Sequence, residues 1–420
     1  MGYQMRFHPR EGRGPSPTRR QFLRLGGLSL VAATGALAGC ERPGRGGGPG
    51  TATVDPVALS RPDRPARLPL YPDAPAIADG LSPEKGGTFK IFNYAEYLSP
   101  DVTKAFGKKY GVTVEVTTFT TQDEAVAKLR TAGSAFDVYF PTPDILGRLA
   151  AGKLLQPLNH TYLPNLKNAW PQLQDPFYDQ GAQYTVPYTA YTTGVGYRAD
   201  KVKSVPANGW DLLWDPAYKG RAYVLDDYRE ALSMALLRAG NKDLNTEDPA
   251  ALKAAGDALR QLVDAVNIKI GIAAYQTVPE GQATVHHCWS GDIINAQYYL
   301  PKDVDASVLG YWYPADLAGP VGTDCMAIPK AATKPVLAHL FLNHLLDNDV
   351  ALENFSFTGY QPALAAATPE KLTADEFIAP NLTSAVVTAD HYAKGLQELQ
   401  LSLDGETTWN NQWAAFKAGR

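Results

Sequence analysis

The chain has 420 residues, of which 45% are apolar and 20% are charged. This length predicts about two to three domains with well-buried cores, and the composition excludes a disordered chain and a protein with many membrane spans. The six Arg and one Glu of residues 1–40 leave 33 basic and 42 acidic residues in 41–420. This excess of acids argues against a nucleic-acid partner and is compatible with a cationic one.

The N-terminal segment reads as an export signal. Residues 18–40, TRRQFLRLGGLSLVAATGALAGC, combine Arg19-Arg20, an uncharged run over 25–39 and a Cys at position 40. The run is shorter than the roughly 20 residues that a membrane-spanning helix needs. The order resembles a twin-arginine signal followed by a lipoprotein processing box, which implies that Cys40 becomes the lipidated first residue of the mature protein. A basic tail before an ordinary core helix is the alternative interpretation.

Residues 41–87 contain 17 Gly or Pro. A stretch of this composition buries too little apolar surface to offset its ordering entropy, so we expect 41–87 to form a flexible tether. The part from Leu68 to Ile77 is more apolar and is the part that could lie against the folded body.

From Thr88 onward, strand and helix patterns alternate. Strands are expected at 89–92, 112–119 and 136–140, and helices at 100–110, 121–132 and 145–154. Gly111 is expected to end the first helix, and the capping box from Thr121 to Glu124 to begin the second. This alternation indicates an α/β sheet with helical crossovers.

A second stretch, from near Gly194, shows the same alternation. Strands are expected at 221–225, 285–289, 308–313 and 325–328, and helices at 228–239, 250–265, 335–346 and 350–357. No internal repeat of fixed period is found, which argues against a solenoid or a propeller.

No catalytic motif stands out, and no cofactor is expected. The chain has no Gly-rich phosphate loop, nucleophile elbow or paired-Cys metal motif. His286 and His287 are adjacent on an expected strand, so their side chains point to opposite faces and are badly placed to share a metal. We therefore expect no metal site.

Acidic and aromatic residues gather where expected strands end. Examples are the segments 93–97, 141–144, 226–230 and 289–292. Ligands of open α/β sheets bind outside the carboxyl ends of the strands, so this placement suggests a pocket for an organic cation. Carboxylates compensate an ammonium for its lost hydration, and aromatic faces add cation–π attraction. The alternative is that these acids cap the following helices.

Seven segments together resemble the extracytoplasmic spermidine/putrescine-binding proteins of ABC importers. In chain order they are FNYAEYLSP (92–100), FDVYFPTPD (136–144), YTVPYTAYTTGVGY (184–197), YKGRAYVLDDYREALSMALLRAG (218–240), WSGD (289–292), DCMAIPKAA (324–332) and FTGYQPALAA (357–366). The resemblance implies an α/β periplasmic-binding-protein fold of the second type, with a ligand cleft between two lobes. It places residues 88–193 and 324–369 in one lobe and 194–323 and 370–420 in the other.

The resemblance also implies a function. The protein would work outside the cytoplasm as a monomer, anchored to a membrane by its lipid, and would deliver a polyamine to the membrane subunits of an importer without catalysing a reaction. Closure of the lobes would bring carboxylates around the amines. The ligand contacts that the resemblance implies are Tyr94, Tyr97, Thr142, Asp144, Asp227, Glu230, Trp289, Asp292, Asp324 and Tyr360, with Gln400, or less favourably Gln397, near the C-terminus.

Two positions depart from the family pattern. Gly322 stands where the family commonly has a Trp, so one wall of the slot would be missing or supplied by Tyr188, Tyr191 or Tyr313. Asp144 stands where a Tyr is usual. The particular polyamine is therefore left open.

Cys288 and Cys325 adjoin the pocket candidates Trp289 and Asp324. A disulfide between them is one expectation, and two buried free thiols are the other.

Other functions stay open at this stage. The same fold serves other solutes, such as an opine, thiamine or ferric ion. An exported lipoprotein hydrolase could use Asp227 with Asp292 or Asp324 as acid and base. A structural surface lipoprotein would not need acids and aromatics that converge at strand ends.

Overall fold

A computed structural model describes residues 59–131 and 135–419. Cys40, the expected export signal and residues 41–58 of the expected tether lie outside the described residues. The strands of the described part are β1 (Thr88–Tyr94), β2 (Thr113–Phe119), β3 (Val138–Tyr139), β4 (Thr185–Arg198), β5 (Ala222–Val224), β6 (Lys269–Ile270), β7 (Val285–Trp289), β8 (Leu309–Trp312), β9 (Val321–Ala327) and β10 (Gln361–Pro362).

These strands form one mixed sheet, in the order β2-β1-β3-β9-β4-β7-β5-β6. The β2-β1-β3 and β7-β5-β6 runs are parallel, which confirms the expected helical crossovers, whereas β9 and β4 run antiparallel to their neighbours. β8 and β10 also pair with β4 in antiparallel fashion. We call β1, β2, β3 and β9 the first half of the sheet, and β5, β6, β7 and β8 the second half.

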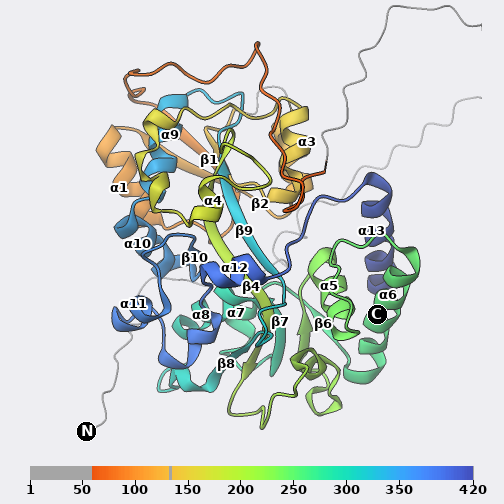
Figure 1. Cartoon of the computed structure of the whole chain (residues 1–420). Coiled ribbons are helices and arrows are strands. Elements are labelled where there is room, and N and C mark those ends of the chain that lie inside the picture. Colours follow the sequence, from red (N-terminus) through yellow and green to blue (C-terminus); the bar gives the residue numbers. More distant parts are fainter. Residues whose placement is uncertain (1–58, 132–134, 420) are drawn as a thin grey trace, which may run out of the picture. The chain divides into compact units, whose positions relative to one another are not determined.

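Strand β4 joins the two halves. Its residues from Thr185 to Thr192 pair with β9, and those from Thr193 onward pair with β7 and β8. The sequence analysis missed most of this 14-residue strand because, buried on both sides, it lacks the alternation that marks a half-exposed strand. Figure 1 shows β4 and β9 running side by side through the middle of the sheet.

Six of the longer helices agree with expected ones. They are α1 (Pro100–Tyr110), α2 (Gln122–Leu129), α5 (Tyr228–Arg238), α6 (Pro249–Val266), α9 (Pro335–Leu345) and α10 (Asn348–Thr358). The sequence analysis missed the long helix α13 (Leu403–Ala418). The shorter ones are α3 (Leu146–Ala151), α4 (Pro171–Gln174), α7 (Ala274–Thr277), α8 (Ser290–Ala296), α11 (Pro369–Ala374) and α12 (Ala389–Lys394). Within the described residues, no helix is long and apolar enough to cross a membrane.

The expected helix ends are present with their physical causes. Gly111 ends α1 in the left-handed conformation, with φ of 68°. Thr121 begins α2 by accepting a hydrogen bond from the Glu124 amide, but the Glu124 carboxylate accepts from Thr120 instead of completing the capping box.

Apolar side chains pack into a separate core on each side of β4. Helices α5, α6 and α13 lie side by side over the second half, where Leu232, Leu259 and Trp409 are fully buried (Figure 1). The first half has its own cores, which include Phe89 and Phe341.

The segment 370–420 is divided between these cores. Val387 and Tyr392 pack with the first half, whereas Trp409 and Phe416 pack with the second. Residues 370–420 therefore do not belong wholly to one side, and the lobe boundaries drawn from the sequence remain a proposal.

Residues 59–87, the described part of the expected tether over 41–87, contact the folded body. This was expected for 68–77 but not for the residues on either side of that stretch. The Ala66 amide donates to the Phe177 carbonyl at 2.8 Å, and Gln183 Nε2 donates to the Leu68 carbonyl at 2.8 Å. The Leu68 side chain is only 2% exposed, and the Glu84 carboxylate accepts from the first amides of α9. Backbone hydrogen bonds and the burial of Leu68 thus compensate the entropy that is lost when this Gly- and Pro-rich segment is ordered.

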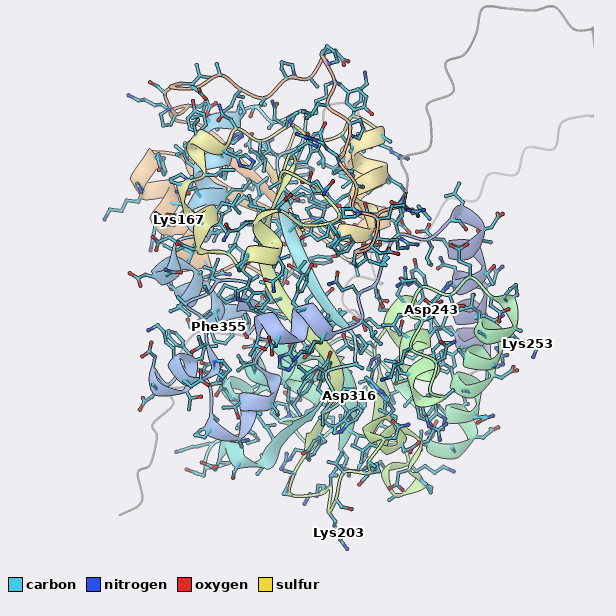
Figure 2. All side chains as sticks on the ribbon, viewed as in Figure 1. Lys167, Lys203, Asp243, Lys253, Asp316 and Phe355 are labelled. Carbon is cyan, nitrogen blue, oxygen red and sulfur yellow. The ribbon has the colours of Figure 1, made fainter. Side chains whose placement is uncertain are left out.

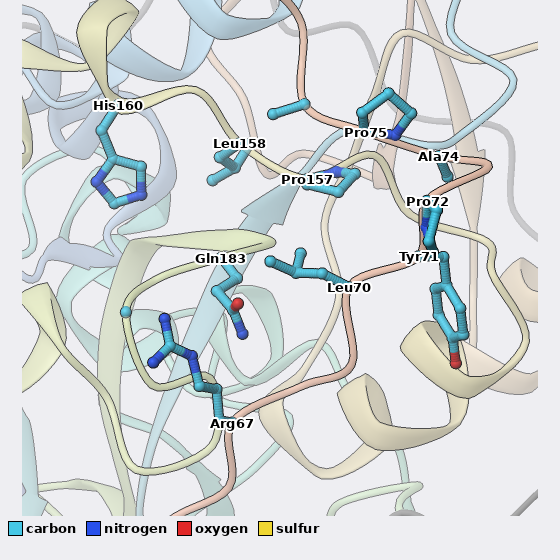
Figure 3. Close-up of a pocket in the computed structure, with 12 residues that line it drawn as sticks. Arg67, Leu70, Tyr71, Pro72, Ala74, Pro75, Pro157, Leu158, His160 and Gln183 are labelled. Atoms are coloured by element: carbon cyan, nitrogen blue, oxygen red, sulfur yellow. The ribbon is translucent and has the colours of Figure 1, made fainter.

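A cavity of about 610 Å³ lies between this N-terminal segment and the loop that follows α3. Figure 3 shows its lining, which includes Arg67, Leu70, Pro75, Leu158, His160 and Gln183. No carboxylate is among the residues that line this cavity, so it lacks a counter-charge for a cation.

The expected alternative of a disulfide between Cys288 and Cys325 is wrong. Both thiols are free and buried. On β4, Cys288 lies opposite Gly194 and Cys325 opposite Pro187, so the two are separated by seven residues of strand, or about 23 Å. A disulfide needs Cα atoms about 4–7 Å apart.

The docking of the N-terminal segment leads to a stability prediction. Leu68→Ala should lower the free energy of unfolding by about 2–5 kcal/mol, because it leaves a cavity in the core. Leu81→Ala in the same segment, where the side chain is 46% exposed, should change it by less than about 0.5 kcal/mol. Urea denaturation of both variants would check this, and equal effects would show that the segment is not docked.

Candidate binding site

A small cavity of about 60 Å³ lies where the two halves of the sheet meet. Its lining comes from the 3-10 turn Pro143–Ile145, from β4 and β9, from α5 and from the segment after α12. The lining residues that carry polar or aromatic side chains are Thr142, Asp144, Tyr191, Thr193, Glu230, Thr323, Tyr392, Gln397 and Glu398.

Asp324 is a buried carboxylate beside this cavity. It lies on β9 opposite Thr189, and only 6% of the residue is exposed. Its Oδ2 accepts a hydrogen bond of 2.6 Å from the Tyr97 hydroxyl, which also contacts the Thr189 hydroxyl. Tyr97 follows β1, so these contacts join β1 to the central strands β4 and β9.

Asp292 is a second buried carboxylate, in the first turn of α8. Its Oδ1 accepts a hydrogen bond of 2.9 Å from the Tyr360 hydroxyl, and its Oδ2 has no hydrogen-bond partner. The Tyr360 ring packs directly on Gly291, where a Cβ would lie 2.6 Å from the ring. The Gly in the WSGD segment thus makes room for this ring.

Glu230 is a third buried carboxylate, in the first turn of α5. Its Oε1 accepts from Trp289 Nε1 at 2.7 Å and from the Thr193 hydroxyl at 2.9 Å. Its Oε2 is buried and has no partner. Trp289 ends β7, so the sheet and α5 position this group together.

Aromatic rings connect the three carboxylates. Tyr191 packs edge-on against Trp289 and Tyr360, with ring centroids 6.3 and 6.5 Å apart. Tyr360 packs edge-on against Tyr97 at 4.9 Å, and Tyr97 against Tyr94 at 5.8 Å. The acids from both halves of the sheet therefore share one aromatic surround.

Burial raises the pKa of each of these acids. The pKa values of Asp324 and Asp292 rise to about 7, and the hydrogen bonds from Tyr97 and Tyr360 only partly offset this. Burial, together with the charge of Asp227, raises the pKa of Glu230 to about 7. The protein thus holds several carboxylates where their charge is unfavourable without a cationic partner.

Basic side chains do not supply that partner. In the described part of the chain, none of the ion pairs or side-chain hydrogen bonds joins Lys or Arg to Glu230, Asp292 or Asp324. The guanidinium of buried Arg229 donates to the Leu399 and Leu244 carbonyls. Exposed lysines such as Lys203 and Lys253 point outward from the ribbon (Figure 2).

Some of the other expected contact residues line the cavity and some do not. Thr142 and Asp144 line the cavity, and Tyr94 contacts Tyr97 while its hydroxyl accepts from Gln122. Asp227 is the N-cap of α5, where its Oδ1 accepts from the amides of Arg229 and Glu230, so the capping interpretation describes its contacts.

Gln400 does not line the cavity, whereas Gln397 does. The backbone carbonyl of Gln400 accepts from Arg61 in the N-terminal segment. Gln397, the less favoured candidate of the sequence analysis, is therefore the one beside the cavity, because nothing in the local sequence shows which residue of 397–400 turns inward.

Tyr191 occupies the place that Gly322 leaves open. A Cβ on Gly322 would lie 2.4 Å from the Tyr191 ring, so the ring lies directly against the glycine backbone. Of the candidates Tyr188, Tyr191 and Tyr313, only Tyr191 lines the cavity. A side chain from β4 therefore forms the wall at this position.

The sequence analysis missed Glu398, which lines the cavity beside Glu230. Burial and the charge of Glu230 raise the pKa of Glu398 well above its ordinary value. Glu398 lies in an irregular segment without any strand or helix pattern, and 167 residues of chain separate it from Glu230.

Metal binding has no structural support in residues 59–131 and 135–419, where no group of three His, Cys, Asp or Glu side chains could hold an ion. His286 stacks on Tyr223, and His287 packs edge-on against Trp210. Burial lowers the pKa of His286 to about 4 and that of His287 to about 3, so both are neutral core residues.

The buried acids lead to a pH prediction. A carboxyl whose pKa is raised on folding binds its proton more tightly in the folded state, so its contribution to stability is lost as pH rises from about 4 to 7. Asp324→Asn does not titrate, so without ligand it should gain stability relative to the wild type by up to a few kcal/mol between pH 5 and pH 8. Urea denaturation at both pH values measures this gain. Asp264→Asn, at an exposed position, should show no such gain. The prediction is contradicted if the difference in free energy of unfolding between Asp324→Asn and the wild type is the same at pH 5 and pH 8.

Comparisons with known proteins agree with the fold described above. The family model described as bacterial extracellular solute-binding protein matches residues 101–380. The spermidine/putrescine-binding periplasmic protein of Escherichia coli is 30% identical over 299 residues, which cover 70% of this chain and 83% of that protein.

Solved structures agree as well. A Listeria monocytogenes protein assigned to spermidine/putrescine ABC transport has a TM-score of 0.68 and 26% identity, and covers 79% of this chain and 99% of its own. The Tp0655 lipoprotein of Treponema pallidum has a TM-score of 0.66 and 21% identity, and covers 78% of this chain and 99% of its own. These similarities confirm the expected two-lobe periplasmic-binding-protein fold.

Proposed function

Because the chain belongs to the bacterial extracellular solute-binding proteins, we propose that it captures a polyamine of the putrescine or spermidine type and delivers it to an ABC importer. Proteins of this family bind solutes and do not transform them, so the chain is not an enzyme and the hydrolase alternative falls. The names of the relatives support the polyamine class.

One observation carries the choice of ligand. Glu230, Asp292 and Asp324 are each about 95% buried, and two of their oxygens have no partner within the described residues. A buried carboxylate needs a counter-charge, and an ammonium group supplies charge and up to three N–H donors. The rings of Tyr97, Tyr191, Trp289 and Tyr360 would cover the methylene stem between amines.

The same chemistry disfavours the other solutes. An opine carries carboxylates, which these acids would repel. Ferric ion needs a cluster of donor side chains, and the described residues hold no group of three His, Cys, Asp or Glu side chains that could supply one. Thiamine carries a single permanent positive charge, which leaves most of these acids without a partner.

Binding must also involve movement. A cavity of about 60 Å³ holds about two water molecules, at about 30 Å³ each, and is too small for a diamine with four methylenes. We infer that two lobes separate to admit the ligand and close around it. They are 88–193 with 324–369, and 194–323 with 370–420 except for the part around Val387 and Tyr392, which packs with the first half. Closure would exclude water and present one shape to the importer's membrane subunits.

The proposal includes the location. The twin-arginine segment would export a folded protein, and lipidation of Cys40 would anchor it as a monomer at the outer side of the cytoplasmic membrane. The periplasmic relatives support an extracytoplasmic site of action.

Thermal unfolding with a panel of solutes tests the ligand. Putrescine or spermidine at a hundredfold excess over Kd should stabilise the protein by about 2.7 kcal/mol. Asp324→Asn should weaken this binding by about 2–5 kcal/mol, because one ammonium is then buried without its counter-charge. If an opine, thiamine or ferric ion stabilises the protein and the polyamines do not, the proposed ligand is wrong.

Fractionation of cells tests the anchor. Wild-type protein should take up labelled fatty acid and sediment with membranes, whereas Cys40→Ser should take up none and be released in soluble form. Cys325→Ser serves as the control, because this buried thiol leaves the processing box intact. Equal labelling of Cys40→Ser and the wild type would contradict the lipoprotein reading.

A further inference from the structure

Glu398 lies on a short segment whose backbone is fixed on two sides. The Leu396 amide donates to the Gly319 carbonyl at 2.8 Å, next to the start of β9. On the other side, Asn245 Oδ1 accepts from the Leu399 amide at 2.7 Å. These bonds determine where the Glu398 side chain leaves the backbone, so its position beside the cavity is built into the fold.

A second carboxylate faces the same cavity. Glu230 and Glu398 both line it, and the Ser233 hydroxyl, one turn after Glu230 on α5, donates to Glu398 Oε1 at 3.4 Å. Trp289 and Thr193 already occupy Glu230 Oε1, whereas Glu230 Oε2 is buried without a partner. The pair therefore has acceptor oxygens available for a donor in the cavity.

Most of the charged side chains around Glu230 and Glu398 are also negative, so they increase the need of this pair for a cation. The side chains that act electrostatically on Glu398 are Asp144, Asp227, Arg229 and Glu230. Tyr191 and Tyr392 also line the cavity and add no charge. The one cation among them, Arg229, stacks on Trp409 and donates to Leu399, Leu244 and Asn245, while its Nε is buried without a partner.

We propose that Glu398 and Glu230 together bind one terminal ammonium of the ligand, so that Glu398 is a specificity-determining residue of the site. This inference rests on the proposed function and adds to it a second acid at one end of the slot. An ammonium offers three N–H donors, which suits the free oxygens of two carboxylates better than those of one. A ligand that places a carboxylate at this end, such as an amino acid, is excluded.

Titration calorimetry with putrescine tests the inference. The variant is Glu398→Gln, and the matched control is Glu353→Gln, an exposed position on α10 that does not line the cavity. Glu398→Gln should bind putrescine about 10- to 100-fold more weakly, and Glu353→Gln should bind it as the wild type does. Without ligand, the melting temperature of Glu398→Gln should equal or exceed that of the wild type, because one of two repelling buried acids is gone.

The outcomes separate the inference from the proposed function. Wild-type protein that binds putrescine, with an equally tight Glu398→Gln, would overturn the inference and leave the function standing. A weaker Glu398→Gln whose melting temperature also falls would assign Glu398 a structural role and overturn the inference too. Wild-type protein that binds neither putrescine nor spermidine would overturn both.

Discussion

Negative charge that is buried without a cation in hydrogen-bond contact is the constraint on which this site depends. Glu230, Asp292 and Asp324 are almost fully enclosed, and only neutral donors reach them. Such an arrangement lowers the stability of the ligand-free protein, since the carboxylates must keep a proton or repel one another. A cationic ligand would supply the counter-charge, and the same carboxylates would then provide both affinity and selectivity.

The sheet explains how the acids come to share one place. β4 joins the two halves, with β9 on one side of it and β7 on the other, so residues at the ends of β1 and β7 and in the middle of β9 meet around a single strand. Each half keeps its own apolar core, as the proposed closure of two lobes requires. The ligand's ammonium groups would then act between bodies that are each already stable.

The sequence predicted much of this because the signals are local. Strand and helix periodicity, the Gly111 end of α1 and the Asp227 cap of α5 are properties of neighbouring residues, and the structure has them. Glu230 and Asp292 were found because they follow strands, whereas Asp324, inside β9, was found through the family resemblance. What failed was non-local: Glu398 is placed by partners far away in the chain, and Cys288 and Cys325 are kept apart by the length of β4. The docking of residues 59–87 also depends on surfaces that composition does not report.

The contact between Gly322 and Tyr191 has a consequence for how such a slot can change. The ring fills the space that any side chain at 322 would need, so a bulky residue there and the ring at 191 are mutually exclusive. Either wall could line a slot, but a change from one to the other requires a paired exchange. A single substitution at either position would create a steric clash or leave a cavity. The shape of the slot is therefore protected against single substitutions.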